Sequence, residues 1–265
     1  MNVPRKLTFA LAALMTAQSL MGVTLADGYR DVDWIKATWF GNDLLTLIVA
    51  VPLLVFSGVA AQRGSFRAFL LWAGGVGYAV YNYAFYMLGA ALNVFFPFYV
   101  IALVLAAAIL IITLGRFEPS SVAFTVRRRT LPLVGAAFVM IGSGLAVAWT
   151  AMWFAYVFAG RPTPVEPDAF RLVAALDLSL MVPALVSGGV LLWQRRPWGF
   201  VIAGMAGVQA SLYLAVLSIN SLIAINGGLA AWPGELVIWG PLEAATITVT
   251  TVLLSSIQPA PKAAK

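Results

Sequence analysis

The sequence has no histidine and no cysteine among its 265 residues. Histidine-ligated haem, zinc and copper sites, iron–sulfur clusters, disulfide relays and histidine-dependent acyl transfer all need these side chains. Lysine is scarce too. We therefore expect no metal, no cofactor and no catalytic residue of these kinds. All four lysines lie in segments expected to be loops or tails, which excludes a retinal Schiff base inside a bundle: Lys6, Lys36, Lys262 and Lys265.

Charge is the next scarce property. Charged residues make up 10% of the chain and apolar residues 62%, against roughly 25% charged in ordinary soluble domains. A helix needs about 20 apolar residues to cross ~30 Å of hydrocarbon, so the uncharged run over 68–115 must turn once, near Gly89 to Asn93. We predict an all-α membrane protein, one transmembrane domain over 1–265, with about eight helices near 7–26, 43–62, 67–89, 93–115, 131–159, 172–193, 198–226 and 236–257.

The first of these segments fits two descriptions. Arg5 and Lys6 followed by an apolar run with Ala26 near its end also form the pattern of a cleaved signal peptide. Its ~20 apolar residues exceed the usual 7–15 of a signal peptide, which favours a retained helix.

Basic residues gather on one side of the predicted membrane. With the N-terminus inside, twelve basic residues face the cytoplasm and four (Arg30, Lys36, Arg161 and Arg171) face outward. The positive-inside rule then places both termini in the cytoplasm. This distribution explains the net charge of +6 without a bound nucleic acid. Arg127 to Arg129 could contact nucleic acid or anionic lipid, but a topology signal is the simpler interpretation. The expected surroundings are the lipid bilayer.

Glycines recur inside the predicted helices without the strand-to-helix setting of a phosphate-binding loop. Small residues allow close approach of transmembrane helices, and we assign this role to Gly74, Gly75, Gly77, Gly142, Gly144, Gly188, Gly189, Gly204 and Gly207.

Two segments resemble each other. Six of nine positions match between Val51 to Val59 and Val182 to Val190, and each copy holds a proline, Pro52 or Pro183, preceded by an aspartate. Both helices would cross in the same direction. The match is either chance similarity of apolar sequence or a parallel 4+4 duplication about an axis along the membrane normal; a duplication predicts bends at equivalent depths.

Two carboxylates, Asp177 and Glu243, lie inside the predicted spans. An ionisable group in hydrocarbon costs at least ~2.5 kcal/mol and marks a candidate site. Each must be protonated, hydrated, hydrogen-bonded or bound to a cation. At 1.5 Å per residue, both lie roughly 8–10 Å below the outer helix ends, in one layer with Asn82 and Asn220.

Helical spacing suggests the neighbours of this layer. Together the polar faces predict an aromatic-rimmed cavity that opens to the outer side. The asparagines also fit simple helix cross-links, and the outer tryptophans fit an interfacial belt. Besides the four residues above, the candidate ligand-binding residues are Tyr78, Tyr86, Trp149, Trp153 and Tyr213.

The strings at Tyr81 to Tyr86, Gly89 to Asn93, Asp177 to Leu180 and Trp193 to Gly199 resemble segments of an uncharacterised bacterial integral membrane protein family. The resemblance covers about half of the chain. It implies a multi-pass protein of the bacterial cell (inner) membrane and supplies no activity, ligand or catalytic residue.

Three functions stay open. The first is binding or movement of a small molecule, ion or proton through the outward cavity. The second is a non-catalytic accessory or assembly subunit with a membrane-protein partner. The third, an intramembrane enzyme using a carboxylate pair, is the weakest because no nucleophile has an adjacent base. The sequence favours the first reading slightly and leans against an enzyme.

Overall fold

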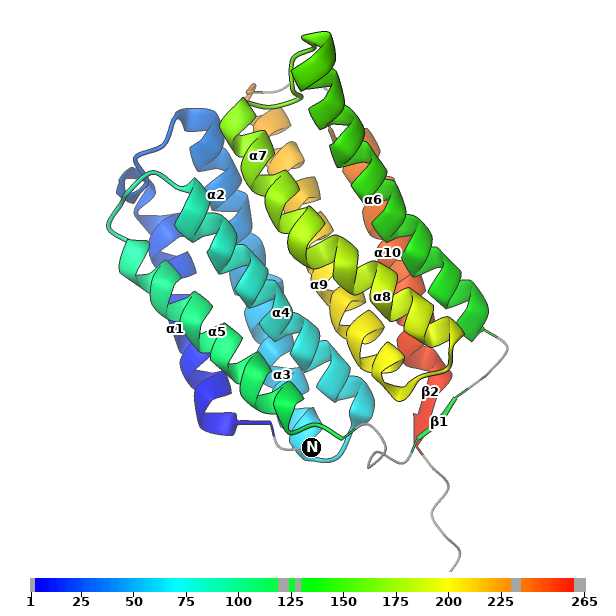
Figure 1. The fold of residues 1–265 in the computed structure, drawn as a ribbon. Coiled ribbons are helices and arrows are strands. Elements are labelled where there is room, and N and C mark those ends of the chain that lie inside the picture. Colours follow the sequence, from blue (N-terminus) through cyan, green and yellow to red (C-terminus); the bar gives the residue numbers. More distant parts are fainter. Residues whose placement is uncertain (1–2, 119–123, 127–129, 230–234, 260–265) are drawn as a thin grey trace, which may run out of the picture.

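The residues that the structure describes form a bundle of eight long helices (Figure 1). The computed structural model describes residues 3–118, 124–126, 130–229 and 235–259. Seven of these helices are long and apolar enough to cross a membrane, and the eighth, α4, lies buried among them, so the predicted all-α membrane bundle is confirmed. The helices are α1 (Arg5–Thr24), α2 with α3 (Asp33–Leu45 and Val51–Gln62), α4 (Phe66–Gly89), α5 (Phe96–Gly115), α6 (Leu131–Ala159), α7 with α8 (Pro167–Leu176 and Val182–Trp193), α9 (Pro197–Asn226) and α10 (Leu236–Ser256).

Two helices begin earlier than the charge pattern predicts. The second starts at Asp33 rather than residue 43, and the sixth at Pro167 rather than residue 172. The expected boundary at Asp43 assumed that a carboxylate ends a membrane helix. Asp43 is instead fully buried and hydrogen-bonded, so the helix continues outward past it. Asp177 accordingly lies ten residues, about 15 Å, from the start of its helix rather than 8 Å.

A π-helical turn precedes the proline in both related segments. The turns span Thr46–Ala50 and Asp177–Met181, where the N–H of Val51 reaches Thr46 O and that of Val182 reaches Asp177 O, five residues back. Proline lacks an N–H, and its ring clashes with the carbonyl four residues earlier. The wider turn relieves this clash, and such turns are frequent at functional sites.

The turn after each segment also recurs. Gly64 and Arg195, 131 residues apart like Pro52 and Pro183, are both left-handed, with φ of 91° and 56°. Each donates to the carbonyl three residues back, and the next residue donates five residues back, to Ala60 O or Leu191 O. This pattern closes the C-terminus of a helix and favours glycine.

Arg195 therefore occupies a position suited to glycine. We expect Arg195→Gly to raise stability by about 1 kcal/mol, because the left-handed region costs a side-chain residue roughly that much. Gly64→Ala, where an added Cβ meets nothing within 4 Å, should lose a similar amount through the backbone alone. Thermal unfolding in detergent measures both. A Tm that falls for Arg195→Gly would mean that the Arg195 side chain outweighs its backbone strain.

Helix contacts repeat between the two halves. α1 packs on α3 and α5 as α6 packs on α8 and α10, and α4 packs on α3 and α5 as α9 packs on α8 and α10. Across the halves, α2 contacts α9, α7 contacts α4, and α4 contacts α9. Figure 1 shows α1 and α6 starting at the same end of the bundle. These repeated contacts are those expected of a parallel repeat, with α4 and α9 in contact between the halves.

A two-stranded sheet lies at the end of the bundle where α1 and α6 start. It joins the segment between α5 and α6 to the segment after α10. β1 (Phe124–Val126) pairs antiparallel with β2 (Ile257–Pro259), directly after α10. Arg67, at the start of α4, donates from Nε to Ile257 O at 2.6 Å and from a terminal nitrogen to Ser255 O at 3.3 Å. The end of α10 is thereby fixed to the centre of the bundle.

Candidate functional site

The centre of the polar layer is α4. Its residues Tyr78, Tyr81, Asn82, Tyr83 and Tyr86 are all at least 98% buried. At 100° per residue, Tyr83 and Tyr86 lie on the side of the helix opposite Tyr81. One helix therefore presents hydroxyl groups to both halves of the bundle. The same polar side chains lower the mean hydropathy of α4, which is why it is not among the seven most apolar helices.

On one side, α4 faces Asp43. Oδ1 of Asp43 accepts from Gln18 Nε2 at 3.0 Å and from the Tyr86 hydroxyl at 2.9 Å, and Oδ2 accepts from the Tyr29 hydroxyl at 2.5 Å. Tyr83 donates to Oε1 of Gln18 at 3.2 Å, which orients the amide toward Asp43. These five residues form the Asp43 cluster. Sequence reasoning found Tyr86 but missed Asp43, although its place before a repeated proline was a signal.

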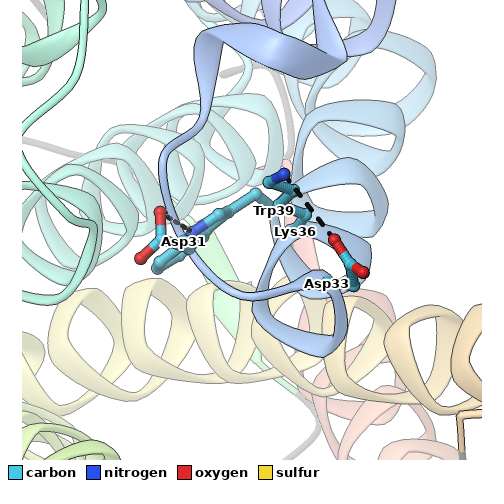
Figure 2. A network of polar contacts seen from close by, with 4 residues as sticks. All are labelled: Asp31, Asp33, Lys36 and Trp39. Atoms are coloured by element: carbon cyan, nitrogen blue, oxygen red, sulfur yellow. Dashed lines mark hydrogen bonds and ion pairs between the residues drawn. The ribbon is translucent and has the colours of Figure 1, made fainter.

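The outer end of this cluster is covered by aromatic rings and a loop. Trp39 stacks on Tyr86 with ring centroids 4.8 Å apart, and its Nε1 donates to Asp31 at 3.0 Å (Figure 2). Asp31 also accepts from the backbone N–H of Ala91 at 2.9 Å. The loop before α2 and the loop after α4 are thus fastened together above Asp43.

Tyr29 belongs to that loop and closes the cluster. Burial, and after it the charge of Asp43, raise the pKa of the Tyr29 phenol above its usual 10.0. Tyr29 therefore stays protonated and donates to Asp43 at every pH below 10, and its contribution to stability is lost progressively as the pH rises from about 10 toward its folded-state pKa.

On the other side of α4 lies Asp177, the first residue of the second π-helical turn. It is 2% exposed. Oδ1 accepts from the Tyr81 hydroxyl at 2.7 Å and Oδ2 from Trp149 Nε1 at 2.8 Å. The Tyr81 ring contacts that of Tyr213 with centroids 4.5 Å apart. These four residues form the Asp177 cluster, which unites three of the sequence-predicted residues.

A third set of contacts links the asparagines. Asn42 Nδ2 donates to Asn82 Oδ1 at 3.4 Å, and the Asn220 amide lies 3.2 Å from Asn42 Oδ1. A Cβ at Gly41 would lie 2.0 Å from Asn220 Oδ1, so this glycine admits the contact. Tyr78, the remaining residue predicted on α4, bonds Thr46 at 3.0 Å. Asn82 and Asn220 thus meet through Asn42, which sequence reasoning did not single out.

Two predicted residues lie apart from these clusters. Glu243, on the peripheral helix α10, is half-buried, and in the described part of the chain no hydrogen bond or ion pair joins it to Asp177. Trp153 is 48% exposed and packs edge-on against Phe158. The sequence predicted the depth of Glu243, but it did not predict the direction in which either side chain points.

Neither buried aspartate has a basic partner among the described residues. The ion pairs found there are Lys36–Asp33 at 3.6 Å (Figure 2) and Arg171–Asp168 at 3.3 Å, both near helix starts with exposed carboxylates. Such pairs contribute little to stability. Among the described residues, the donors that hold Asp43 and Asp177 are all uncharged.

The halves are related but not identical at these clusters. Gln18 and Trp149, the donors from α1 and α6, are 131 residues apart, as are Thr46 and Asp177. The carboxylate of the first half lies at residue 43 rather than 46, about one helical turn further out. The second half therefore has a carboxylate where the first has a threonine hydroxyl.

Comparison with known proteins does not assign the chain to a family. The chain matches no family model, no curated protein and no solved structure.

Proposed function

We propose that this multi-pass membrane protein binds or moves a proton, ion or other small ligand by means of its buried carboxylates. One observation carries the proposal: Asp43 and Asp177 are buried in membrane-spanning helices without a basic partner in the described chain. Hydrogen-bond donors stabilise an anion only in part, and an uncompensated charge at this depth is costly. A proton or small cation would neutralise it.

Reconstitution tests this function. Liposomes holding the purified chain and a trapped pH-sensitive dye should show proton or cation movement under an imposed ion gradient, which protein-free liposomes lack. Asp177→Asn should reduce the movement at least about tenfold, because asparagine cannot bind and release a proton, while it can donate to Tyr81 and accept from Trp149. Its Tm should stay close to that of the wild type.

The second candidate, a non-catalytic accessory subunit, rests on Glu243. This half-buried carboxylate on a peripheral helix fits a contact with a donor on another membrane protein. Native mass spectrometry from mild detergent separates the two functions. A retained partner protein, together with no ion movement in liposomes, would favour the accessory role and contradict our proposal.

The proposed location is the bacterial cell membrane with both termini in the cytoplasm. Among the described residues, Arg5, Lys6, Arg63, Arg67, Arg116, Arg195 and Arg196 belong to the end expected inside, against Arg30, Lys36, Arg161 and Arg171 at the other end. Arg127 to Arg129, which the topology prediction also used, lie outside the described residues.

Thiol labelling tests this orientation. The chain has no cysteine, so single cysteines can be labelled without background. With an impermeant reagent on intact cells, we expect Glu166→Cys to be labelled and Arg63→Cys to be labelled only after lysis; both positions are exposed. Labelling of Arg63→Cys in intact cells, with none at position 166, would reverse the orientation.

A further inference from the structure

The two buried carboxylates differ in how fully their hydrogen-bonding capacity is used. A carboxylate offers about four acceptor positions. Asp43 fills three of them with bonds from Gln18, Tyr29 and Tyr86. Asp177 fills two, with one bond to each oxygen. The Asp177 cluster therefore has acceptor capacity to spare.

An unused hydroxyl lies beside it. The Tyr213 hydroxyl is buried and forms no hydrogen bond of good geometry among the described residues, although it lies near the Tyr81 hydroxyl and the two rings are in contact. Tyr213 is 6% exposed. A buried hydroxyl without a partner costs roughly 1–3 kcal/mol. Its position next to a carboxylate with spare capacity points to a ligand bound by both.

The groups around Asp177 determine the charge of that ligand. α4 brings Tyr81 and α9 brings Tyr213, α6 brings Trp149, which does not titrate, and α8 brings no charged side chain. Arg171 on α7 pairs with Asp168, and Glu235, at the start of α10, is a further acid that acts on Tyr213. An anion would meet only acidic and phenolic groups here, whereas a cation would meet oxygen atoms.

We infer that Asp177, Tyr81 and Tyr213 form a binding site for one monovalent cation, a proton or an alkali-metal ion such as Na⁺, while Asp43 serves structure. The inference rests on the proposed function and deepens it by naming the ligand class and the half of the molecule that holds it. The π-helical turn that begins at Asp177 supports it, since the equivalent turn begins with the neutral Thr46.

Infrared difference spectroscopy on the full chain in detergent tests this site. A protonated carboxyl gives a C=O band that disappears when the proton leaves. Between pH 5 and pH 8 we expect the wild type to show such a band and Asp177→Asn to lack it. Adding NaCl at constant pH, with choline chloride as control, separates the two cations: loss of the band with Na⁺ alone identifies an alkali-metal ion, and no effect identifies the proton.

Tyr213→Phe is the sharper variant, because it removes only the unpartnered hydroxyl and should fold. We expect it to shift the pH midpoint of the band by about one unit, or to weaken Na⁺ binding about tenfold. The matched control is Tyr99→Phe, which removes another buried hydroxyl without a partner in the described chain and should leave the Asp177 band unchanged. A purely structural Tyr213 would instead give a stable protein with an unshifted band.

Several results would overturn the inference. An unshifted Tyr213→Phe band would remove the hydroxyl from the site. A band that persists in Asp177→Asn and vanishes in Asp43→Asn would move the site to the first half and leave the proposed function standing. If no carboxyl titrates and radioactive Na⁺ does not bind, both the inference and the proposed function fail.

Discussion

Asp43→Leu should prevent stable folding or lower the Tm by about 5 °C or more. Leucine would remove the acceptor that Gln18, Tyr29 and Tyr86 share. Tyr29 would then have no acceptor, while Gln18 and Tyr86 would keep only longer bonds of 3.3 Å to the Tyr29 hydroxyl and the Trp39 carbonyl. A buried donor without an acceptor costs about 1–3 kcal/mol, so Tyr29 alone accounts for about that much and all three donors for up to roughly 9 kcal/mol, against a total stability of about 5–15 kcal/mol for a typical protein. Each kcal/mol lost from the free energy of unfolding lowers the Tm by about 2–4 °C, which gives the expected loss.

Two further variants identify the cause of that loss. Asp43→Asn keeps one carbonyl oxygen and should lie between wild type and leucine, because Tyr29 then faces an amide nitrogen and loses its acceptor. Asp33→Leu changes a carboxylate on the same helix that is 89% exposed, and it should cost less than about 1 kcal/mol. Equal Tm values for Asp43→Leu and Asp33→Leu would show that the Asp43 cluster does not stabilise the fold.

The helices were predictable because hydrocarbon thickness fixes their length. Apolar run length placed the fifth helix at 131–159 and the start of the eighth at Leu236, as observed. The same reasoning failed at Asp43, where it treated a carboxylate as a boundary. The donors that keep Asp43 in the helix come from α1, from the loop after it and from α4, and run length carries no information on such distant partners.

Three site residues were predictable in depth but not in direction, whereas Asp177 lies deeper than expected. Asn82, Asn220 and Glu243 lie as far from their helix ends as expected. The rotation of a helix about its axis depends on the packing of its neighbours, and the hydropathy pattern of α10 does not reveal it. Glu243 therefore lies outside the polar contacts. Asn42, which was not in the predicted layer, contacts both Asn82 and Asn220.

The sequence located the glycines of the helices but did not show which of them lie at close helix contacts. Gly142 and Gly144 were both predicted to permit close approach. A Cβ at Gly142 would meet Val186 at 2.9 Å, whereas one at Gly144 would meet nothing within 4 Å. The backbones of α6 and α8 approach closely, since a Cβ at Gly189 would lie 2.6 Å from Gly135 O.

Gly189→Ala should therefore lower the Tm by about 5 °C or more. The added methyl group meets a backbone carbonyl, and a helix backbone cannot move aside as a flexible side chain does. Gly135 is similarly confined, since its own Cβ would lie 2.7 Å from Gly189 O. The two helices must separate, and overpacking of this kind costs typically 1–3 kcal/mol. Because α8 follows the π-helical turn of Asp177, the displacement should also disturb the Tyr81 and Trp149 hydrogen bonds.

Gly144→Ala is the matched control on α6. It adds the same methyl group to open space and should leave the Tm unchanged or raise it slightly, since alanine favours the helix by about 0.5–1 kcal/mol. Thermal unfolding in one detergent measures both variants, and tryptophan fluorescence reports on Trp149 at the same time. A Gly189→Ala protein as stable as Gly144→Ala, with unchanged fluorescence, would show that α6 and α8 do not pack through these two glycines.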